Sequence, residues 1–214
     1  MKPGSDYLLI VEDDPDILKL LQTTLTFRGY RVITARNGRE GLDIIRAERP
    51  AIVIADIMMP KLDGFGLVHR MRLAPETCDI PVVFITATYV APEDKEFALD
   101  IGATRFLQKP VDLEAFLKTI AELLESGTPA VIEPMREQNF YEGYRQRLQI
   151  KLEQKNKQIA REEHLLKTRQ DENNEELLAS LRHAIDEREE IKLLLDQVQG
   201  QIEKLDHPGQ QQGE

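Results

Sequence analysis

Hydrophobic positions in the first half of the chain fall into short runs that alternate with amphipathic segments of helical length. The runs are apolar and β-prone, as buried parallel strands are, and lie at residues 7–11, 31–35, 51–55, 82–85 and 105–107. The segments between and after them predict helices at residues 15–28, 38–48, 63–73, 92–101 and 112–125. This strict alternation predicts a five-stranded, doubly wound parallel sheet of the α/β class.

The second half of the chain has the pattern of long helices. It holds no proline from Met135 to His207 and is dense in Glu, Lys, Arg, Gln and Leu. From Leu177 to Leu205, apolar residues recur alternately every four and three positions, and only Arg188 interrupts them. This spacing predicts a coiled coil. A weaker seam, from Tyr141 to Leu166, is out of register with it by one residue, so we expect a break within residues 170–174.

Two shapes fit this helical half. Two arms of roughly 45 to 55 Å could fold back as an antiparallel hairpin, or one near-continuous rod could pair in parallel with a second chain. Arg188 within the seam would favour an oligomer that offers an acid such as Glu187 or Glu189 of a partner chain. From the Gly and Pro residues and the composition, we expect four parts: a globular domain at 1–126, a linker at 127–134, helices at 135–206 and a disordered tail at 207–214.

Polar side chains follow several of the predicted strands. Glu12 and Asp13 follow the first, Asp56 the third and Thr86 the fourth, while Lys109 comes soon after the fifth. Ligand chemistry in open α/β sheets gathers at the carboxyl ends of the strands, so these groups should converge on one crevice. A carboxylate such as that of Asp56 can accept a phosphoryl group as an acyl phosphate, and this transfer needs charge neutralisation above all.

The neighbouring groups suit that chemistry. Glu12 and Asp13 would supply hard oxygen ligands for Mg²⁺, and the Met58 carbonyl could add a backbone ligand. The Lys109 ammonium would interact as a positive charge with one phosphoryl oxygen, and the Thr86 hydroxyl could donate a hydrogen bond to another. The simpler explanation, that acids at strand ends only cap helices, suits Asp14 but not Asp56, because a carboxylate after a buried run is costly without a cation.

Several motifs resemble the receiver domain of two-component response regulators, the CheY-like family. They are Leu-Ile-Val-Glu-Asp-Asp at 9–14, Ala-Asp-Ile-Met-Met-Pro at 55–60, Asp-Gly at 63–64, Ile-Thr-Ala at 85–87, Gly-Ala at 102–103 and Lys-Pro at 109–110. The resemblance covers residues 7–125. It implies a flavodoxin-like fold and a histidine kinase or phosphotransfer protein as the phosphate donor.

The resemblance also implies a role for each residue. Asp56 would be the phosphoacceptor, and Asp13, Asp56 and the Met58 carbonyl would hold Mg²⁺, with Glu12 contributing directly or through water. Thr86 and Lys109 would occupy the positions that contact the phosphoryl group in this family, and Phe106 would occupy the position of its rotating aromatic switch. Phosphorylation would then draw Thr86 inward, let Phe106 turn and change the face formed by residues 92–125.

Composition narrows the classes of partner. The net charge is −10, and residues 130–206 carry 17 acidic against 13 basic side chains, so we expect no nucleic-acid partner. One cysteine, Cys78, can form neither an internal disulfide nor a metal cluster. The N-terminus lacks the apolar stretch of a signal peptide, and no run has membrane-spanning length, so we expect a cytoplasmic protein without membrane insertion.

Together these observations predict a phosphorylation-controlled response regulator that signals through its coiled coil, as a homodimer or by docking another protein. It would not be an enzyme beyond assisting its own phosphorylation and dephosphorylation. The alternative is a phosphotransfer or phosphatase protein that uses a histidine of the helical half, His164 or His183.

Overall fold

The computed structural model describes residues 7–87, 91–126, 134–168 and 174–207. The chain divides into two compact units, Met1–Met135 and Arg136–Glu214. The predicted linker and tail fall almost wholly outside the described residues, so their boundaries stay predictions. Within the ranges that the structure describes, no helix combines the length and the apolar character needed to cross a membrane.

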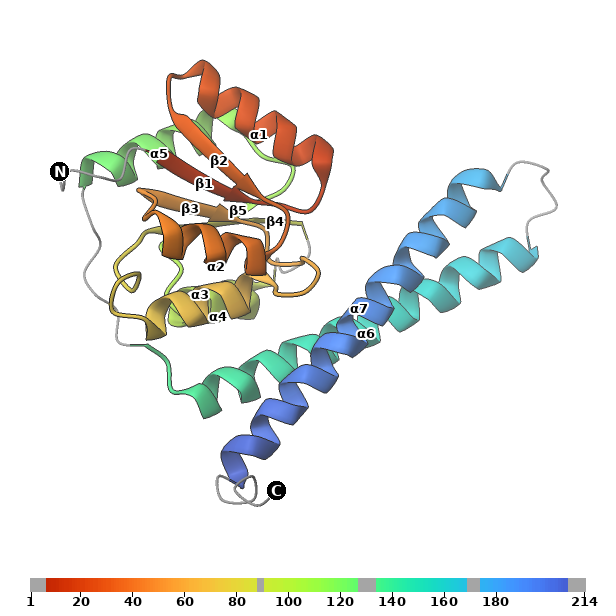
Figure 1. The fold of residues 1–214 in the computed structure, drawn as a ribbon. Helices are drawn as coiled ribbons and strands as arrows, with labels where there is room; N and C mark the ends of the chain where they lie inside the picture. Colours follow the sequence, from red (N-terminus) through yellow and green to blue (C-terminus); the bar gives the residue numbers. More distant parts are fainter. Residues whose placement is uncertain (1–6, 88–90, 127–133, 169–173, 208–214) are drawn as a thin grey trace. The chain divides into compact units, whose positions relative to one another are not determined.

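The first unit is a five-stranded parallel sheet with helices on both faces (Figure 1), as the hydrophobic pattern predicts. The strand order is β2-β1-β3-β4-β5, and every neighbouring pair is parallel. Helices α1 and α5 cover one face, and α2, α3 and α4 cover the other. The elements are β1 (Tyr7–Val11), α1 (Pro15–Phe27), β2 (Arg31–Ala35), α2 (Gly38–Ala47), β3 (Ile52–Ala55), α3 (Gly64–Leu73), β4 (Val82–Thr86), α4 (Pro92–Asp100), β5 (Arg105–Gln108) and α5 (Leu113–Ser126).

Alternating side chains of the strands enter two hydrophobic cores. Val83 and Ile85 of β4 join the core under α1 and α5, together with Phe116 and Ile120 of α5. Phe84, between them in sequence, packs against Phe65 of α3 with ring centroids 5.7 Å apart. The strand is buried throughout, because each face of the sheet is covered by helices.

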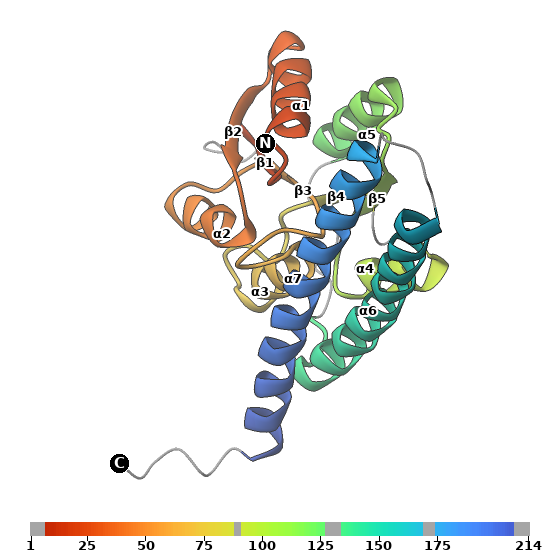
Figure 2. The same cartoon turned by 90° about the vertical axis from the view of Figure 1, so that its right-hand side faces the viewer.

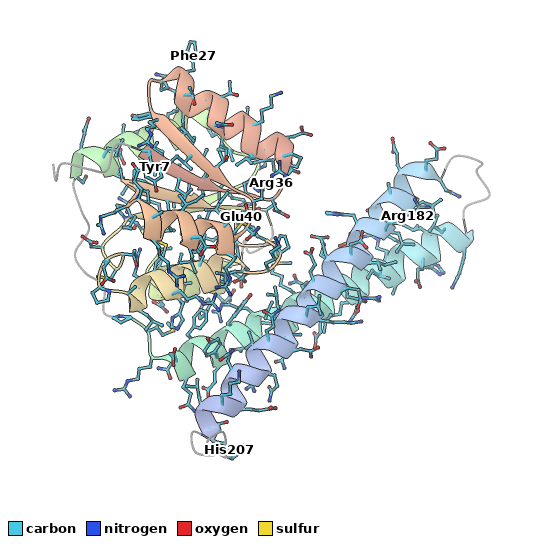
Figure 3. The ribbon with its side chains drawn as sticks, viewed as in Figure 1. Tyr7, Phe27, Arg36, Glu40, Arg182 and His207 are labelled. Atoms are coloured by element: carbon cyan, nitrogen blue, oxygen red, sulfur yellow. The ribbon has the colours of Figure 1, made fainter. Side chains whose placement is uncertain are left out.

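Side-chain caps fix the starts of the helices that leave the strand ends. The Asp14 carboxylate accepts from the backbone N–H groups of Asp16 and Ile17 at 2.8 and 3.1 Å, which confirms the predicted cap of α1. At α2, Asn37 Oδ1 accepts from the Glu40 N–H at 3.0 Å, while Glu40 Oε2 accepts from the Arg36 N–H at 3.0 Å (Figure 3). These side-chain caps fix the residues at which the loops of this sheet edge end and the helices begin.

A buried arginine holds the loops at the opposite, amino edge of the sheet. The Arg72 guanidinium donates to the Gly102 carbonyl at 2.7 and 3.0 Å and to the Ile80 carbonyl at 3.0 Å. It thereby ties the end of α3 to the chain before β4 and to the turn before β5. Burial lowers the pKa of Arg72 to about 10, so the group stays charged at neutral pH.

The second unit consists of two long helices, α6 (Glu137–Thr168) and α7 (Glu175–Asp206), packed side by side (Figures 1 and 2). Arg145 bonds to Gln199, Lys155 to Glu187 and Glu162 to Ser180, so residue numbers fall along one helix as they rise along the other. The pair is therefore an antiparallel hairpin, which settles the alternative left open by the sequence. The helices end and begin where a break is expected, and residues 169–173 lie outside the described ranges.

The seam of the hairpin follows the predicted spacing in α7 and in part of α6. The buried residues at predicted positions are Leu148 and Ile159 of α6 and Ala184, Ile191, Val198 and Ile202 of α7, while α6 also buries Phe140, Tyr144 and Lys151 outside the predicted seam. Arg188 differs from the expectation, because its guanidinium pairs with Glu189 of the same chain at 2.8 Å. Its charge therefore does not require an acid from a partner chain.

We predict that Gly102→Ala destabilises the first unit by about 2–4 kcal/mol in urea denaturation. Gly102 has a φ of +105°, and a methyl group there would lie 2.6 Å from Arg72 Nε, so backbone strain and overpacking add. Gly29→Ala is the matched control: its φ is +87°, but a methyl group meets no atom within 4 Å, and we expect a loss of about 1 kcal/mol. Equal losses in both variants would contradict the role given to Arg72.

Candidate functional site

Four strand ends, those of β1, β3, β4 and β5, place the candidate residues at the carboxyl edge of the sheet. Val11 and Ala55 are partners in the β1–β3 register, so Glu12 and Asp56 follow neighbouring strands at the same level. The Asp56 N–H donates to the Val11 carbonyl at 3.0 Å, which holds the two chain segments together. Lys109 follows β5, and its N–H donates to the Thr86 carbonyl at 2.9 Å. The predicted convergence is therefore a consequence of parallel strand register.

The Lys109 ammonium lies between two buried carboxylates. Its Nζ is 2.6 Å from Asp56 Oδ2 and 2.9 Å from Glu12 Oε2. The side chains of Lys109, Asp56 and Glu12 are 11 %, 10 % and 2 % exposed. Such short, charge-assisted contacts are strong because little water reaches them. Lys109 therefore supplies the positive charge that offsets the cost of burying the Asp56 carboxylate.

A third carboxylate completes an acidic pocket. Oxygen atoms of Glu12, Asp13 and Asp56 all lie within 4.8 Å of one another, and Asp13 is exposed. Hard carboxylate oxygens are the ligands that Mg²⁺ prefers. When all three carboxylates are ionised, they and the ammonium carry a net charge of −2, which one divalent cation would neutralise. The donor set therefore fits a divalent metal ion.

The pKa values of the cluster follow from burial and mutual charge. Burial, and next the charge of Asp56, raise the pKa of Glu12 to about 7, although Lys109 partly offsets them. Burial alone would lower the pKa of Lys109, but Asp56 and Glu12 outweigh it and raise that pKa, so the ammonium persists. Because folding raises the Glu12 pKa from 4.5, the stability contributed by Glu12 falls as the pH rises from about 4.5 to 7.

The remaining predicted residues lie around this cluster. Thr86 is fully buried as the last residue of β4, and Phe106 is half-buried on β5, where it is the register partner of Phe84. Met58 is half-buried in the loop that follows Asp56. The structure thus brings Thr86 next to Lys109 through the backbone, while the roles of Thr86, Phe106 and the Met58 carbonyl stay predictions.

Sequence reasoning missed how the loop after Asp56 is held. The Gly64 N–H donates to the Ile57 carbonyl and the Gly38 N–H to the Leu62 carbonyl, both at 2.8 Å. A methyl group at Gly64 would lie 2.3 Å from the Asp56 carbonyl oxygen, so only glycine permits this approach. The signal was present as the Asp63-Gly64 pair at a helix start, but it does not by itself reveal a contact with Asp56.

The two helical histidines lie in the second unit. His164 and His183 are both exposed, on α6 and α7. His183 Nε2 is 3.7 Å from Glu187 Oε2, one turn away, and the same oxygen accepts from Lys155 at 2.6 Å. An exposed histidine beside an acid is the arrangement that the alternative function requires, so His183 is its stronger candidate.

Comparison with known proteins assigns the first unit. Residues 8–121 match the family described as the response regulator receiver domain. The probable transcriptional regulator ycf27 of Porphyra purpurea is 39% identical over 123 residues, which make up 56% of this chain and 49% of the relative. The transcriptional regulatory protein GlrR of Escherichia coli K12 is 40% identical over 131 residues, 61% of this chain and 29% of that protein. The chain thus spans about half the length of the first relative and less of the second.

Solved structures show the same likeness. The chemotaxis response regulator CheY4 of Vibrio cholerae superposes with a TM-score of 0.52 at 33% identity, covering 56% of this chain and 98% of that one. The signal receiver domain of a histidine kinase from Syntrophus aciditrophicus gives a TM-score of 0.53 at 31% identity, covering 57% and 92%. The family match ends at residue 121, before α6 begins.

We predict that Lys109→Gln lowers the stability of the protein by about 3 kcal/mol at pH 8, because two buried carboxylates lose their cation. The loss should shrink at pH 6, where Glu12 takes up a proton. Adding Mg²⁺ should raise the melting temperature of this variant more than that of the wild type, since a divalent ion can replace the missing charge.

Lys61→Gln serves as the control, because this lysine is exposed and its Nζ lies 4.0 Å from Glu40. It should change neither stability nor the response to Mg²⁺. If Mg²⁺ stabilises Lys109→Gln no more than the wild type, the acidic pocket does not bind the ion as described.

Proposed function

The chain belongs to the response regulator receiver domain family, and on that premise we propose that Asp56 accepts a phosphoryl group from a histidine kinase or phosphotransfer protein. One observation carries the proposal: Lys109 Nζ lies 2.6 Å from Asp56 Oδ2 at the carboxyl edge of the sheet. A carboxylate held against a fixed ammonium, beside a pocket that fits a divalent ion, has the charge neutralisation that phosphoryl transfer requires.

In the transfer, a carboxylate oxygen of Asp56 forms a bond to phosphorus as the bond from phosphorus to the donor's imidazole nitrogen breaks. The nitrogen leaves with the bonding electrons, and an acyl phosphate forms on Asp56. Lys109 is placed to move its hydrogen bond from the Asp56 oxygen to a phosphoryl oxygen. Glu12, Asp13, Asp56 and the Met58 carbonyl would hold Mg²⁺, which neutralises charge on the phosphoryl group when bound.

The protein acts as a regulator rather than an enzyme with a separate substrate, since its chemistry is confined to gaining and losing its own phosphoryl group. Thr86 and Phe106 are the switch residues: the Thr86 hydroxyl moves toward the phosphoryl group, and Phe106 turns into the space released. Phe106 is partly exposed, so its ring can still move from solvent into the interior, whereas Thr86 is already fully buried beside the site. This difference in exposure supports the proposed roles.

The helical hairpin is the output element, and it passes the signal on by pairing with a second copy of the chain in the cytoplasm. Ile150, Leu178 and Leu193 of the hairpin are exposed in the described residues, and pairing of two copies could remove such apolar side chains from water. Two relatives are named transcriptional regulators. With 17 acidic against 13 basic residues between 130 and 206, however, this hairpin suits a protein partner better than DNA.

A second candidate function is phosphotransfer or phosphatase activity at a helical histidine. The exposed His183 beside Glu187 favours it over His164. Against it, Glu187 is already bound by Lys155. The two candidates differ in where phosphate becomes attached and are separated by the labelling experiment that follows.

We predict that acetyl phosphate with Mg²⁺ labels the wild type, and that Asp56→Asn abolishes the label. Asp14→Asn is the matched control: Asp14 is the next exposed acid at this edge and only caps α1, a task that asparagine also performs. Intact-protein mass spectrometry measures the added phosphoryl group. A label that survives in Asp56→Asn and disappears in His183→Gln would replace this proposal with the second candidate.

We predict that the whole protein doubles its mass in light scattering when Mg²⁺ and beryllofluoride, a phosphoryl mimic, are added, and that Asp56→Asn prevents the change. We expect this because, in the proposed function, phosphorylation of Asp56 leads the hairpins of two chains to pair. A dimer under both conditions would make the hairpin a constitutive dimerisation element. A monomer under both would contradict the homodimer and favour another protein as partner.

A further inference from the structure

Three phenylalanines form a cluster on the α2, α3 and α4 face of the sheet. Phe65 of α3 meets Phe84 of β4 and Phe97 of α4 edge to face, with ring centroids 5.7 and 5.2 Å apart and interplanar angles of 89° and 85°. Phe65 and Phe84 are fully buried, and Phe97 is nearly so. We call these residues the aromatic triad. Edge-to-face rings hold a narrow geometry, so moving one ring displaces the others.

One end of the triad is joined to the backbone that carries Asp56. Phe65 directly follows Gly64, whose N–H donates to the Ile57 carbonyl at 2.8 Å. The position of a Gly64 Cβ lies 2.3 Å from the Asp56 carbonyl oxygen and 2.8 Å from Phe84 Cε1. Asp56, Gly64 and Phe84 are therefore packed without space between them. A shift of the Asp56–Ile57 peptide must move Gly64, and Phe65 with it.

The other end of the triad anchors α4. This helix has only nine residues, and an alanine, Ala91, stands at its N-cap and supplies no side-chain cap. Its buried apolar side chains are Phe97 and Ala98, so the contact of Phe97 with Phe65 is a large part of its attachment to the sheet unit. Phe84, the third ring, is also the β-register partner of Phe106. The triad thus lies between Asp56, α4 and the strand that carries the proposed switch aromatic.

We propose that Phe65 is a positioning residue that couples the state of Asp56 to the position of α4, by a route separate from Thr86 and Phe106. The inference rests on the proposed function, because it takes phosphorylation of Asp56 as its input. Phosphorylation alters the charge held by the Asp56 side chain, the peptide beneath it adjusts, and Gly64 and Phe65 carry that adjustment to Phe97 and α4.

The test replaces the ring of Phe65 while keeping an apolar side chain. Phe65→Leu removes both edge-to-face contacts but leaves Asp56, Lys109 and the acidic pocket unchanged. Phe116→Leu is the matched control, because Phe116 is equally buried but lies in the core under α1 and α5. Phe97→Leu removes the α4 end of the same contact and serves as a second test variant should Phe65→Leu fold poorly.

Hydrogen–deuterium exchange of residues 92–100 is measured in the whole protein with Mg²⁺, with and without beryllofluoride, and ¹⁹F NMR measures whether beryllofluoride binds. In the wild type and Phe116→Leu, beryllofluoride should change the exchange of α4. In Phe65→Leu and Phe97→Leu, it should still bind, but the change in α4 should be lost.

The outcomes separate the inference from the proposed function. If the α4 response persists in Phe65→Leu and Phe97→Leu, the coupling route is wrong while the phosphoacceptor role of Asp56 stands. A response lost equally in Phe116→Leu would also overturn the route, since any loosening of the core would then suffice. If beryllofluoride does not bind the wild type, the proposed function fails first, and the inference falls with it.

Discussion

The ion pairs of Lys109 with Asp56 and Glu12 are the interaction on which the rest of the structure depends. Two carboxylates buried side by side repel each other and lose hydration, and without a cation at least one of them would have to stay protonated. The ammonium reaches both, at 2.6 and 2.9 Å, because β1, β3 and β5 are parallel and end at the same edge. The sheet therefore has to form before the charges can be balanced. Once formed, the ion pairs hold the ends of β1, β3 and β5 together.

Two buried cations serve opposite edges of the same sheet in different ways. At the amino edge, Arg72 donates only to backbone carbonyls, those of Thr77, Ile80 and Gly102, and joins the end of α3 to the loop before β4 and the turn before β5. At the carboxyl edge, Lys109 contacts carboxylates whose charge it does not fully cancel. The first arrangement is complete in itself and purely structural. The second leaves a net negative pocket, which favours a divalent ion and a phosphoryl group and so gives this edge its chemistry.

Much of the fold was predictable, because the spacing of hydrophobic residues and the residues that cap helices can be recognised from neighbouring positions in the sequence. The strands, the helices and the Asp14 cap follow from them. The contacts of Arg72 and of Gly64 were not predictable, since they depend on which loops meet in space, and a charged arginine is ordinarily expected at the surface. The hairpin was one of two shapes that share the same seam spacing, and only the one-residue register shift near 170–174 pointed to it. Arg188 pairs with Glu189, its neighbour in sequence, a contact that the spacing of the seam does not indicate.

A crystal structure of the whole protein with Mg²⁺ and beryllofluoride tests the central claim most directly, that the carboxyl edge of the sheet is one phosphoryl-accepting site. The account predicts beryllofluoride bonded to an Asp56 carboxylate oxygen, a metal ion held by the acidic pocket, and Lys109 Nζ turned from Asp56 to a fluorine atom. An Asp56 that binds no beryllofluoride while Lys109 keeps both of its carboxylate partners would contradict it.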